Sequence, residues 1–284
     1  RMMSVSERLE RLGLSYRPRR GGSSQQTEER PHPATAHLWK GQCNCSYWHG
    51  LFGGIYLNHL RHAVYENLVK ADIGADEVEE KREGYRPSVQ ITDIDCDGEE
   101  EIVIDTRSLH VLVVPHAGGS VAEIDYKDAA FNVTNVLARR EEAYHDITGV
   151  NTTREKGAPA DGIASIHELK KGLPQDLEGV FPYDEYPRFS FHDHFLAAGS
   201  DVDAARCVRE SDLGDFADRE YQIAQQPHVE AGIISFILER AAGINEANGH
   251  EEMNLEKSFQ IMIDRPVLLV KYKLLRRKAS ISDL

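Results

Sequence analysis

The chain has 284 residues, 40% of them hydrophobic, which is enough for one large domain or two smaller domains with buried cores. Its net charge of −14 argues against a nucleic-acid partner, because affinity for the phosphate backbone comes from clustered lysine and arginine. No apolar run reaches membrane-spanning length, no signal peptide is recognisable, and the 4 cysteines are too scattered for a disulfide framework. We therefore expect a cytoplasmic protein with no membrane partner.

The N-terminal part of the chain has a helical pattern. A Ser-x-x-Glu capping box followed by a glycine predicts a short helix over Ser4–Leu12. Residues 17–36 are rich in Arg, Pro, Gly, Ser, Gln and Thr, which predicts a flexible connection. A second helix is predicted from apolar residues that recur at three-to-five spacing over Leu51–Leu68. These pieces cannot close a core alone, so residues 1–86 are interpreted as a fragment of a helical bundle.

The segment 42–61, QCNCSYWHGLFGGIYLNHLR, concentrates amphipathic side chains. Its polar and aromatic members are Gln42, Asn44, Tyr47, Trp48 and His49, followed by Gly53 and Gly54. A surface that binds sugar needs this mixture, because flat rings cover C–H faces while amides and imidazoles hydrogen-bond to hydroxyl groups. The alternative is a polar, aromatic contact between helices, in which every buried amide or indole N–H must find a partner. The residues alone leave both interpretations open.

Beyond Pro87 the apolar periodicity changes from 3.6 to 2. Strands are predicted at Glu101–Thr106, His110–Pro115, Ser120–Tyr126, Arg219–Ala224, Gly232–Arg240, Ser258–Ile263 and Val267–Leu274. Crossover helices are missing between them, which predicts antiparallel pairing. The expected fold class is mainly β, with a large antiparallel β-sandwich over residues 87–284 preceded by the small helical fragment. Because the chain ends close behind a strand, and an uncovered sheet edge is a liability, we expect the natural protein to continue.

An acidic stretch leads into the strand predicted at Glu101. Carboxylates alternate in a D-x-D-x-D-G pattern, which can surround a hard cation with oxygen ligands. The candidate ligands for a structural calcium ion are Asp93, Asp95, Asp97 and Glu101. A complete EF-hand loop would require a glutamate where Ile104 stands, so the alternative is an acidic turn without metal.

Two further groups of polar residues carry weaker signals. Phe189–Phe195, read as a strand, would expose both of its histidines and bury Asp193 against a backbone donor or an arginine such as Arg188. Leu137–His145, read as a helix, would align Arg139 with a glutamate and a histidine on one face, which favours a solvated cluster of ion pairs.

At this point the sequence resembles a known family. The runs His37–Asn44 and Tyr47–Leu57 are similar to a signature segment of family-57 glycoside hydrolases, in their α-amylase/4-α-glucanotransferase branch. Downstream matches keep the order of the family and occur at Asp97-Gly98, Pro115, Gly118-Gly119, Glu123–Tyr126, Arg139–His145, Tyr183-Asp184, Arg188, Asp193–Phe195 and Leu213–Phe216. The resemblance spans most of the chain, and the Trp-His-Gly-x-Phe-Gly-Gly run is its most specific element.

The resemblance implies a larger enzyme with a distorted (β/α) barrel, a helical bundle that closes over it and a C-terminal β-sandwich like that of galactose mutarotase. The nucleophilic Glu and the acid/base Asp of this family lie on the barrel, for which no sequence is present in this chain. We therefore assign no catalytic residue or catalytic cofactor, and expect the chain to be catalytically silent alone. The implied partners are an α-1,4-glucan or maltooligosaccharide and the N-terminal barrel of the same protein.

The resemblance also implies a substrate-binding set near the N-terminus. Its members are His37, Trp39, Gln42, Asn44, Tyr47, Trp48 and His49. The aromatic rings of Tyr47 and Trp48 would stack on a glucosyl unit, while the amides and imidazoles would hydrogen-bond to sugar hydroxyls or orient the acids of the barrel.

Two interpretations from other functional classes remain. The sandwich would bind glucan by itself if it is a carbohydrate-binding module. A mutarotase-like sandwich would instead epimerise an aldose with a glutamate base and a histidine acid, for which the candidates are Glu142, His145, His192 and His194.

Overall fold

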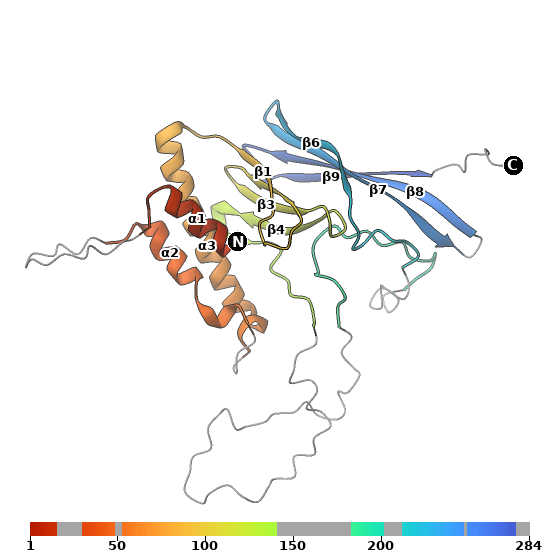
Figure 1. Cartoon of the computed structure of the whole chain (residues 1–284), viewed down its shortest axis with the longest axis horizontal. Helices are drawn as coiled ribbons and strands as arrows, with labels where there is room; N and C mark the ends of the chain where they lie inside the picture. The colour runs from red at the N-terminus through yellow and green to blue at the C-terminus, as the bar shows by residue number, and fades with distance from the viewer. Residues whose placement is uncertain (16–29, 49–52, 141–182, 202–211, 247–248, 277–284) are drawn as a thin grey trace, which may run out of the picture.

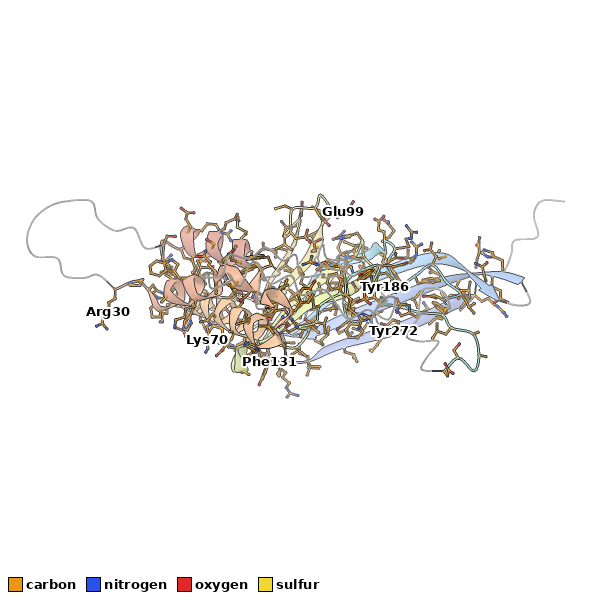
Figure 2. All side chains as sticks on the ribbon, turned by 90° about the horizontal axis from the view of Figure 1, so that it is seen from below. Arg30, Lys70, Glu99, Phe131, Tyr186 and Tyr272 are labelled. Carbon is orange, nitrogen blue, oxygen red and sulfur yellow. The ribbon has the colours of Figure 1, made fainter. Side chains whose placement is uncertain are left out.

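The computed structural model describes residues 1–15, 30–48, 53–140, 183–201, 212–246 and 249–276. Helices gather at one end of an elongated molecule and two β-sheets occupy the rest, and two views at right angles agree on this arrangement (Figures 1 and 2). Both sheets are antiparallel throughout. The predicted fold class, a mainly β antiparallel sandwich preceded by helices, is confirmed.

Three helices form the N-terminal layer around a small apolar core of their own. They are α1 (Met2–Arg11), α2 (Pro33–Gly41) and α3 (Asn58–Glu83), with two short 3-10 helices, η1 (Asn44–Ser46) and η2 (Gly54–Tyr56), between α2 and α3. The core residues are Val5, Leu9, Ala34, Leu38, Val64, Leu68, Ala71 and Ala75. Close approach of α2 and α3 requires Gly74, because a Cβ there would lie 2.8 Å from the Cβ of Ala34.

Two boundaries of the helical layer differ from the sequence prediction. Helix α2 begins at Pro33, inside the stretch predicted as a flexible connection, because proline is pre-organised for a first helical position and the His32 side chain accepts the Ala34 N–H at 3.2 Å. The second predicted helix begins only at Asn58, because Gly53 and Gly54, with φ of 106° and 49°, interrupt the helical path before it.

The sandwich consists of two antiparallel meanders. The first sheet has the order β1 (Ser88–Thr92), β2 (Glu101–Asp105), β3 (Leu109–Val114), β4 (Ser120–Tyr126) and β5 (Phe131–Asn132), with the 3-10 helix η3 (Lys127–Ala129) between β4 and β5. The second sheet has the order β6 (Gln222–Glu230), β7 (Ile233–Glu246), β8 (Gly249–Met262) and β9 (Leu268–Arg276). Each predicted strand overlaps an observed one, with β7 and β8 longer than expected. The strand predicted at Arg219–Ala224 is shifted, since β6 begins at Gln222 and continues to Glu230, and β1 and β5 were not predicted.

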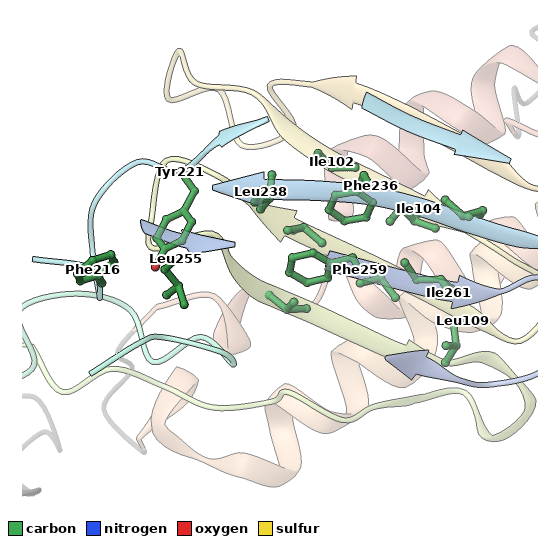
Figure 3. Close-up of a cluster of buried hydrophobic side chains, with 14 of the residues drawn as sticks. Ile102, Ile104, Leu109, Phe216, Tyr221, Phe236, Leu238, Leu255, Phe259 and Ile261 are labelled. Atoms are coloured by element: carbon green, nitrogen blue, oxygen red, sulfur yellow. The ribbon is translucent and has the colours of Figure 1, made fainter. Parts of the chain in front are cut away.

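The inner faces of the two sheets share one apolar core (Figure 3). Ile102 and Ile104 of β2 are fully buried there, as the alternation of the strand requires. From the other sheet, the rings of Phe236 and Phe259 stack with centroids 4.7 Å apart and an interplanar angle of 4°. This shared core fixes the stacking of the sheets.

The strand predicted at Phe189–Phe195 is wrong. Ser190 makes a single bridge to β4, and Phe191 has a φ of 68°, which breaks the extended path. Asp193 pairs with the buried ammonium group of Lys257 at 2.6 Å and accepts the hydroxyl of Tyr221 at 2.6 Å, where an arginine or a backbone donor was expected. The anchoring of this segment thus depends on a lysine inside the sandwich.

The helix predicted over Leu137–His145 is absent from its described part. Residues 137–140 have no regular structure, and residues 141–145 lie outside the described residues. Arg139 and Arg188 instead converge on Asp184, with Nη2 to Oδ1 distances of 2.8 and 2.7 Å. This pairing joins segments 45 residues apart, which helical spacing could not anticipate.

A buried network of charged groups joins the helices to the first sheet. The Arg1 guanidinium lies 2.7 Å from Asp72 on α3, and 3.2 and 3.3 Å from Glu123 and Asp125 on β4. All three carboxylates are buried. Burial alone lowers the pKa of Arg1, but these carboxylates raise it above its ordinary value, so the guanidinium stays charged.

Lys127 and Arg8 extend this network. Lys127 Nζ lies 2.8 Å from Asp76 on α3 and 2.6 Å from Asp105 on β2, while Arg8 on α1 lies 2.6 Å from Asp76. Burial alone raises the pKa of Asp105, but His110 and Lys127 hold it well below its ordinary value. Each ionised carboxylate thus depends on a cation from another element, so the helical layer and the sheet must be positioned together.

We predict that Asp72→Asn lowers the free energy of unfolding by about 3–5 kcal/mol, because it removes the buried carboxylate that both Arg1 and Arg8 contact. Urea unfolding measures this loss. The control is Glu83→Gln, which removes the same charge from an exposed position of the same helix and should change stability by less than about 0.5 kcal/mol. Equal losses in the two variants would contradict a structural role for the buried network.

Candidate functional site

The connection between α2 and α3 presents three aromatic side chains to solvent. Trp39, in the last turn of α2, is 48% exposed, and Tyr47 and Trp48, which follow η1, are 41% and 51% exposed. Gln42 and Asn44 are also exposed on this connection. Five of the seven residues predicted to bind substrate are therefore exposed on the stretch from Trp39 to Trp48.

The path of this connection is fixed by backbone contacts. The Tyr47 hydroxyl donates to the carbonyl of Gly41 at 2.5 Å, and the Ile55 N–H donates to the carbonyl of Trp48 at 3.0 Å. Gly54 is required here, because a Cβ at this position would lie 2.2 Å from the Trp48 carbonyl oxygen. Burial, followed by the nearby Cys43, raises the pKa of Tyr47 to about 12, so its hydroxyl stays a donor at neutral pH.

Of the two histidines in the predicted set, one can be placed. His37 Nδ1 lies 2.9 Å from Oδ1 of Asn67, whose amide nitrogen donates to the carbonyl of Ala63 at 2.8 Å. With the amide oriented this way, Nδ1 carries the proton and Nε2 of the neutral ring is an acceptor. His49 lies outside the described residues.

A residue that sequence reasoning missed connects this surface to the sandwich. Arg61 on α3 donates to the carbonyl of Ile55 at 2.6 Å and to Asn135 Oδ1, beyond β5, at 2.9 Å. Asn135 also donates to Asn58, the first residue of α3, at 3.0 Å. Nothing local in the sequence signals this contact, because 74 residues separate Arg61 from Asn135.

The described residues also form a cavity of about 930 Å³ between α1, α3 and β1. Its lining combines charged groups, including Arg1, Asp72 and Lys127, with apolar ones such as Met2 and Val103, and it contains Tyr47 but neither tryptophan. Several of these charged groups pair with one another, such as Arg1 with Asp72 and Lys127 with Asp76. Tyr47 therefore borders both the cavity and the aromatic surface, whereas Trp39 and Trp48 lie outside the cavity lining.

Asp93, Asp95 and Asp97 lie on the loop between β1 and β2, and Glu101 is the first residue of β2. These four predicted metal ligands divide into two groups. Ligand atoms of Asp93, Asp95 and Glu101 all lie within 4.8 Å of one another, and so do those of Asp97, Glu101 and His116. Burial, with Asp95 and Asp97 adding to it, raises the pKa of Glu101.

Sequence reasoning missed His116, which joins the second of these groups. The antiparallel register pairs Ile102 with Val113, so the start of β2 meets the end of β3, just before His116. That pairing was the signal that could have found it.

We predict that Gly54→Ala destabilises the chain by more than the roughly 1–2 kcal/mol expected for a left-handed residue, because the added Cβ also collides with the Trp48 carbonyl. In a Trp39→Phe background, where Trp48 is the remaining tryptophan, Gly54→Ala should also shift the wavelength of the fluorescence emission. Gly13→Ala is the matched control, since Gly13 has a φ of +72° and open space around it. The same stability loss in both variants, with unchanged emission, would refute the proposed role of Gly54.

Comparisons with known proteins place this geometry in a family. The model of the alpha-amylase/4-alpha-glucanotransferase middle domain matches residues 1–74, and that of the C-terminal domain matches residues 93–282. A 4-alpha-glucanotransferase of Thermococcus litoralis is 35% identical over 245 residues, covering 86% of this chain and 34% of the relative. An alpha-amylase of Pyrococcus abyssi is 38% identical over 188 residues, covering 66% of this chain and 27% of the relative.

The fold agrees with these matches. The crystal structure of the 4-alpha-glucanotransferase from Thermococcus litoralis superposes with a TM-score of 0.67 at 28% identity, covering 98% of this chain and 34% of that structure. The chain thus spans about a third of the length of such relatives. The resemblance inferred from the sequence is confirmed. Because the C-terminal domain model alone matches more than half of its residues, this chain belongs to the alpha-amylase/4-alpha-glucanotransferase family.

Proposed function

We propose that this chain is the substrate-contacting helical segment and accessory β-sandwich of an α-glucan-processing enzyme. The observation that carries this proposal is the exposed surface of Trp39, Tyr47 and Trp48, which lies within the part of the chain that matches the family's middle domain. The substrate class is an α-1,4-glucan or maltooligosaccharide, as the names of the matching amylases and 4-alpha-glucanotransferases suggest.

The chemistry of this surface suits a sugar. An indole or phenol ring kept in solvent has an open face, and burying that face against the C–H groups of a glucosyl unit is favourable. The exposed amides of Gln42 and Asn44 supply both donors and acceptors for hydroxyl groups. His37, whose ring orientation is fixed by Asn67, adds an acceptor on the preceding helix.

The reactive carboxylates are proposed to lie in the part of the relatives that this chain does not span. A retaining glycosidase needs two carboxyl groups roughly 5 Å apart that both reach the substrate. Glu123 and Asp125 are close neighbours, but both are buried and face Arg1, so no sugar reaches them. The chain is therefore proposed to be silent alone and to act with a catalytic barrel. This two-carboxylate chemistry uses no cofactor.

A second candidate function is glucan binding by this chain without a barrel. The three exposed rings also favour this function, since their exposure does not depend on a catalytic domain. The described residues give less support to an aldose epimerase. Both ring nitrogens of His192 face backbone carbonyls, of Ala217 and Pro187, and His194 is paired with Asp212 at 2.8 Å.

Where the protein works is a separate proposal. No helix among the described residues is both long and apolar enough to span a bilayer. The thiols of Cys43, Cys45 and Cys96 are exposed and unbridged, which supports a reducing compartment such as the cytoplasm.

We predict that Trp48→Ala in the full-length enzyme lowers kcat/KM for maltooligosaccharides at least about tenfold, because the stacking ring is lost. The melting temperature should stay unchanged, since the side chain is 51% exposed. Phe131→Ala, at a 45% exposed aromatic residue on β5, is the control that should leave turnover unaltered. Unchanged turnover by Trp48→Ala would remove Trp48 from the substrate site.

Isothermal titration of the 284-residue chain with maltooligosaccharides separates the two candidate functions. Heat that disappears in Trp48→Ala would show that the chain binds glucan unaided. No heat at millimolar ligand, with a full-length enzyme that depends on Trp48, would show that the surface works only beside the barrel.

A further inference from the structure

The loop between β1 and β2 contains a buried carboxylate whose charge is poorly compensated. Glu101 is 1% exposed at the start of β2. Its Oε2 accepts the Ile94 N–H at 2.9 Å, whereas its Oε1 is buried and has no hydrogen-bond partner among the described residues. A buried carboxylate oxygen without a partner is costly, so this atom points to a ligand.

The neighbours of Glu101 add negative charge. Asp93 and Asp95 each offer a carboxylate oxygen within 4.8 Å of a carboxylate oxygen of Glu101. The basic side chain beside them is His116, whose Nδ1 is 3.7 Å from Glu101 Oε1 and whose Nε2 is 3.4 Å from Asp97. Both distances exceed those of a strong charged hydrogen bond. One imidazole, which lies near Asp97 and Glu101 only, therefore does not neutralise the charge of all four carboxylates.

The loop backbone holds these carboxylates in place. Asp93 accepts the N–H groups of Cys96 at 2.7 Å, Asp97 at 3.1 Å and Gly98 at 3.0 Å. The loop follows β1 and leads into β2, so a bound ion would hold the two ends of the loop together, where Thr92 pairs with Glu101. Figure 2 shows Glu99, between the candidate ligands, on a part of the loop that projects from the body of the molecule.

We propose that this loop binds one divalent cation of the calcium class through the carboxylates of Asp93, Asp95 and Glu101. Oxygen-only donors select a hard cation such as Ca²⁺ over zinc, which prefers nitrogen and sulfur ligands. Asp97 and His116 flank the site on the side of β3 and set its outer charge. The ion neutralises Glu101 and fixes the turn from β1 into β2. This site is independent of glucan binding.

Calcium titration of the chelator-treated 284-residue chain tests the proposal. We expect a Kd between roughly 10⁻⁶ and 10⁻³ M, the range of calcium loops with moderate ligand charge, and a melting temperature that rises with Ca²⁺. Glu101→Gln should weaken binding at least tenfold and abolish the rise in melting temperature. Glu99→Gln is the control, because it removes the same charge from an exposed position of the same loop.

A second variant keeps the test decisive if Glu101→Gln fails to fold. Asp95 is exposed, so Asp95→Asn should leave the fold intact and still weaken Ca²⁺ binding at least tenfold. No binding at millimolar Ca²⁺ would overturn the proposal, and so would equal losses in Glu99→Gln and Glu101→Gln. Zinc binding that His116→Ala abolishes, without calcium binding, would overturn the oxygen-ligand assignment.

Discussion

The buried charges between the helical layer and the first sheet are the constraint on which the rest of the structure depends. Arg1 and Arg8 approach from the N-terminal helix and its start, Asp72 and Asp76 from α3, and the strands supply Asp105, Glu123 and Asp125. Buried ion pairs add little net stability over apolar packing, but breaking one leaves a charge without a partner. Such a network therefore specifies position. The helices, whose own apolar core is small, are held against the first sheet by these ion pairs.

This fixed orientation determines how the aromatic surface is presented. The connection that carries Trp48 is attached to α3 through Gly54, and α3 is attached to the sandwich through Asp72 and the Arg61–Asn135 contact. A sugar platform of exposed rings loses affinity if its geometry is loose, because ordering it on binding costs conformational entropy. The structure supplies that order beforehand from long-range contacts. The sandwich thus contributes to the proposed binding surface without touching the sugar.

Local patterns predicted the sandwich well and the connections poorly. Alternation located β2 because its inward residues Ile102 and Ile104 are fully buried, whereas Val103 and Asp105 are half-buried; Glu101, which is also buried, departs from this pattern. Composition failed to predict the start of α2, because Pro33 and the capping His32 lie in a segment whose composition is typical of a linker. Spacing also failed for Asp193, which lies on no strand and whose partner Lys257 is 64 residues away on β8. For the candidate sites, side-chain chemistry was enough to predict the aromatic residues and the carboxylates. His116 could be identified only from the pairing of β2 with β3, and Arg61 only from its long-range contact with Asn135.

The central claim is that the helical layer and the sandwich form one cooperative unit held by buried charges. Both tryptophans, Trp39 and Trp48, lie in or beside the helical layer, so their emission reports that layer, while far-ultraviolet circular dichroism reports the strands as well. Urea unfolding of the chain followed by both signals tests the claim most directly. If the claim holds, tryptophan emission and circular dichroism give the same urea concentration at half-unfolding and the same dependence of the unfolding free energy on urea. Tryptophan emission that changes at lower urea, while the sheet signal persists, would contradict it.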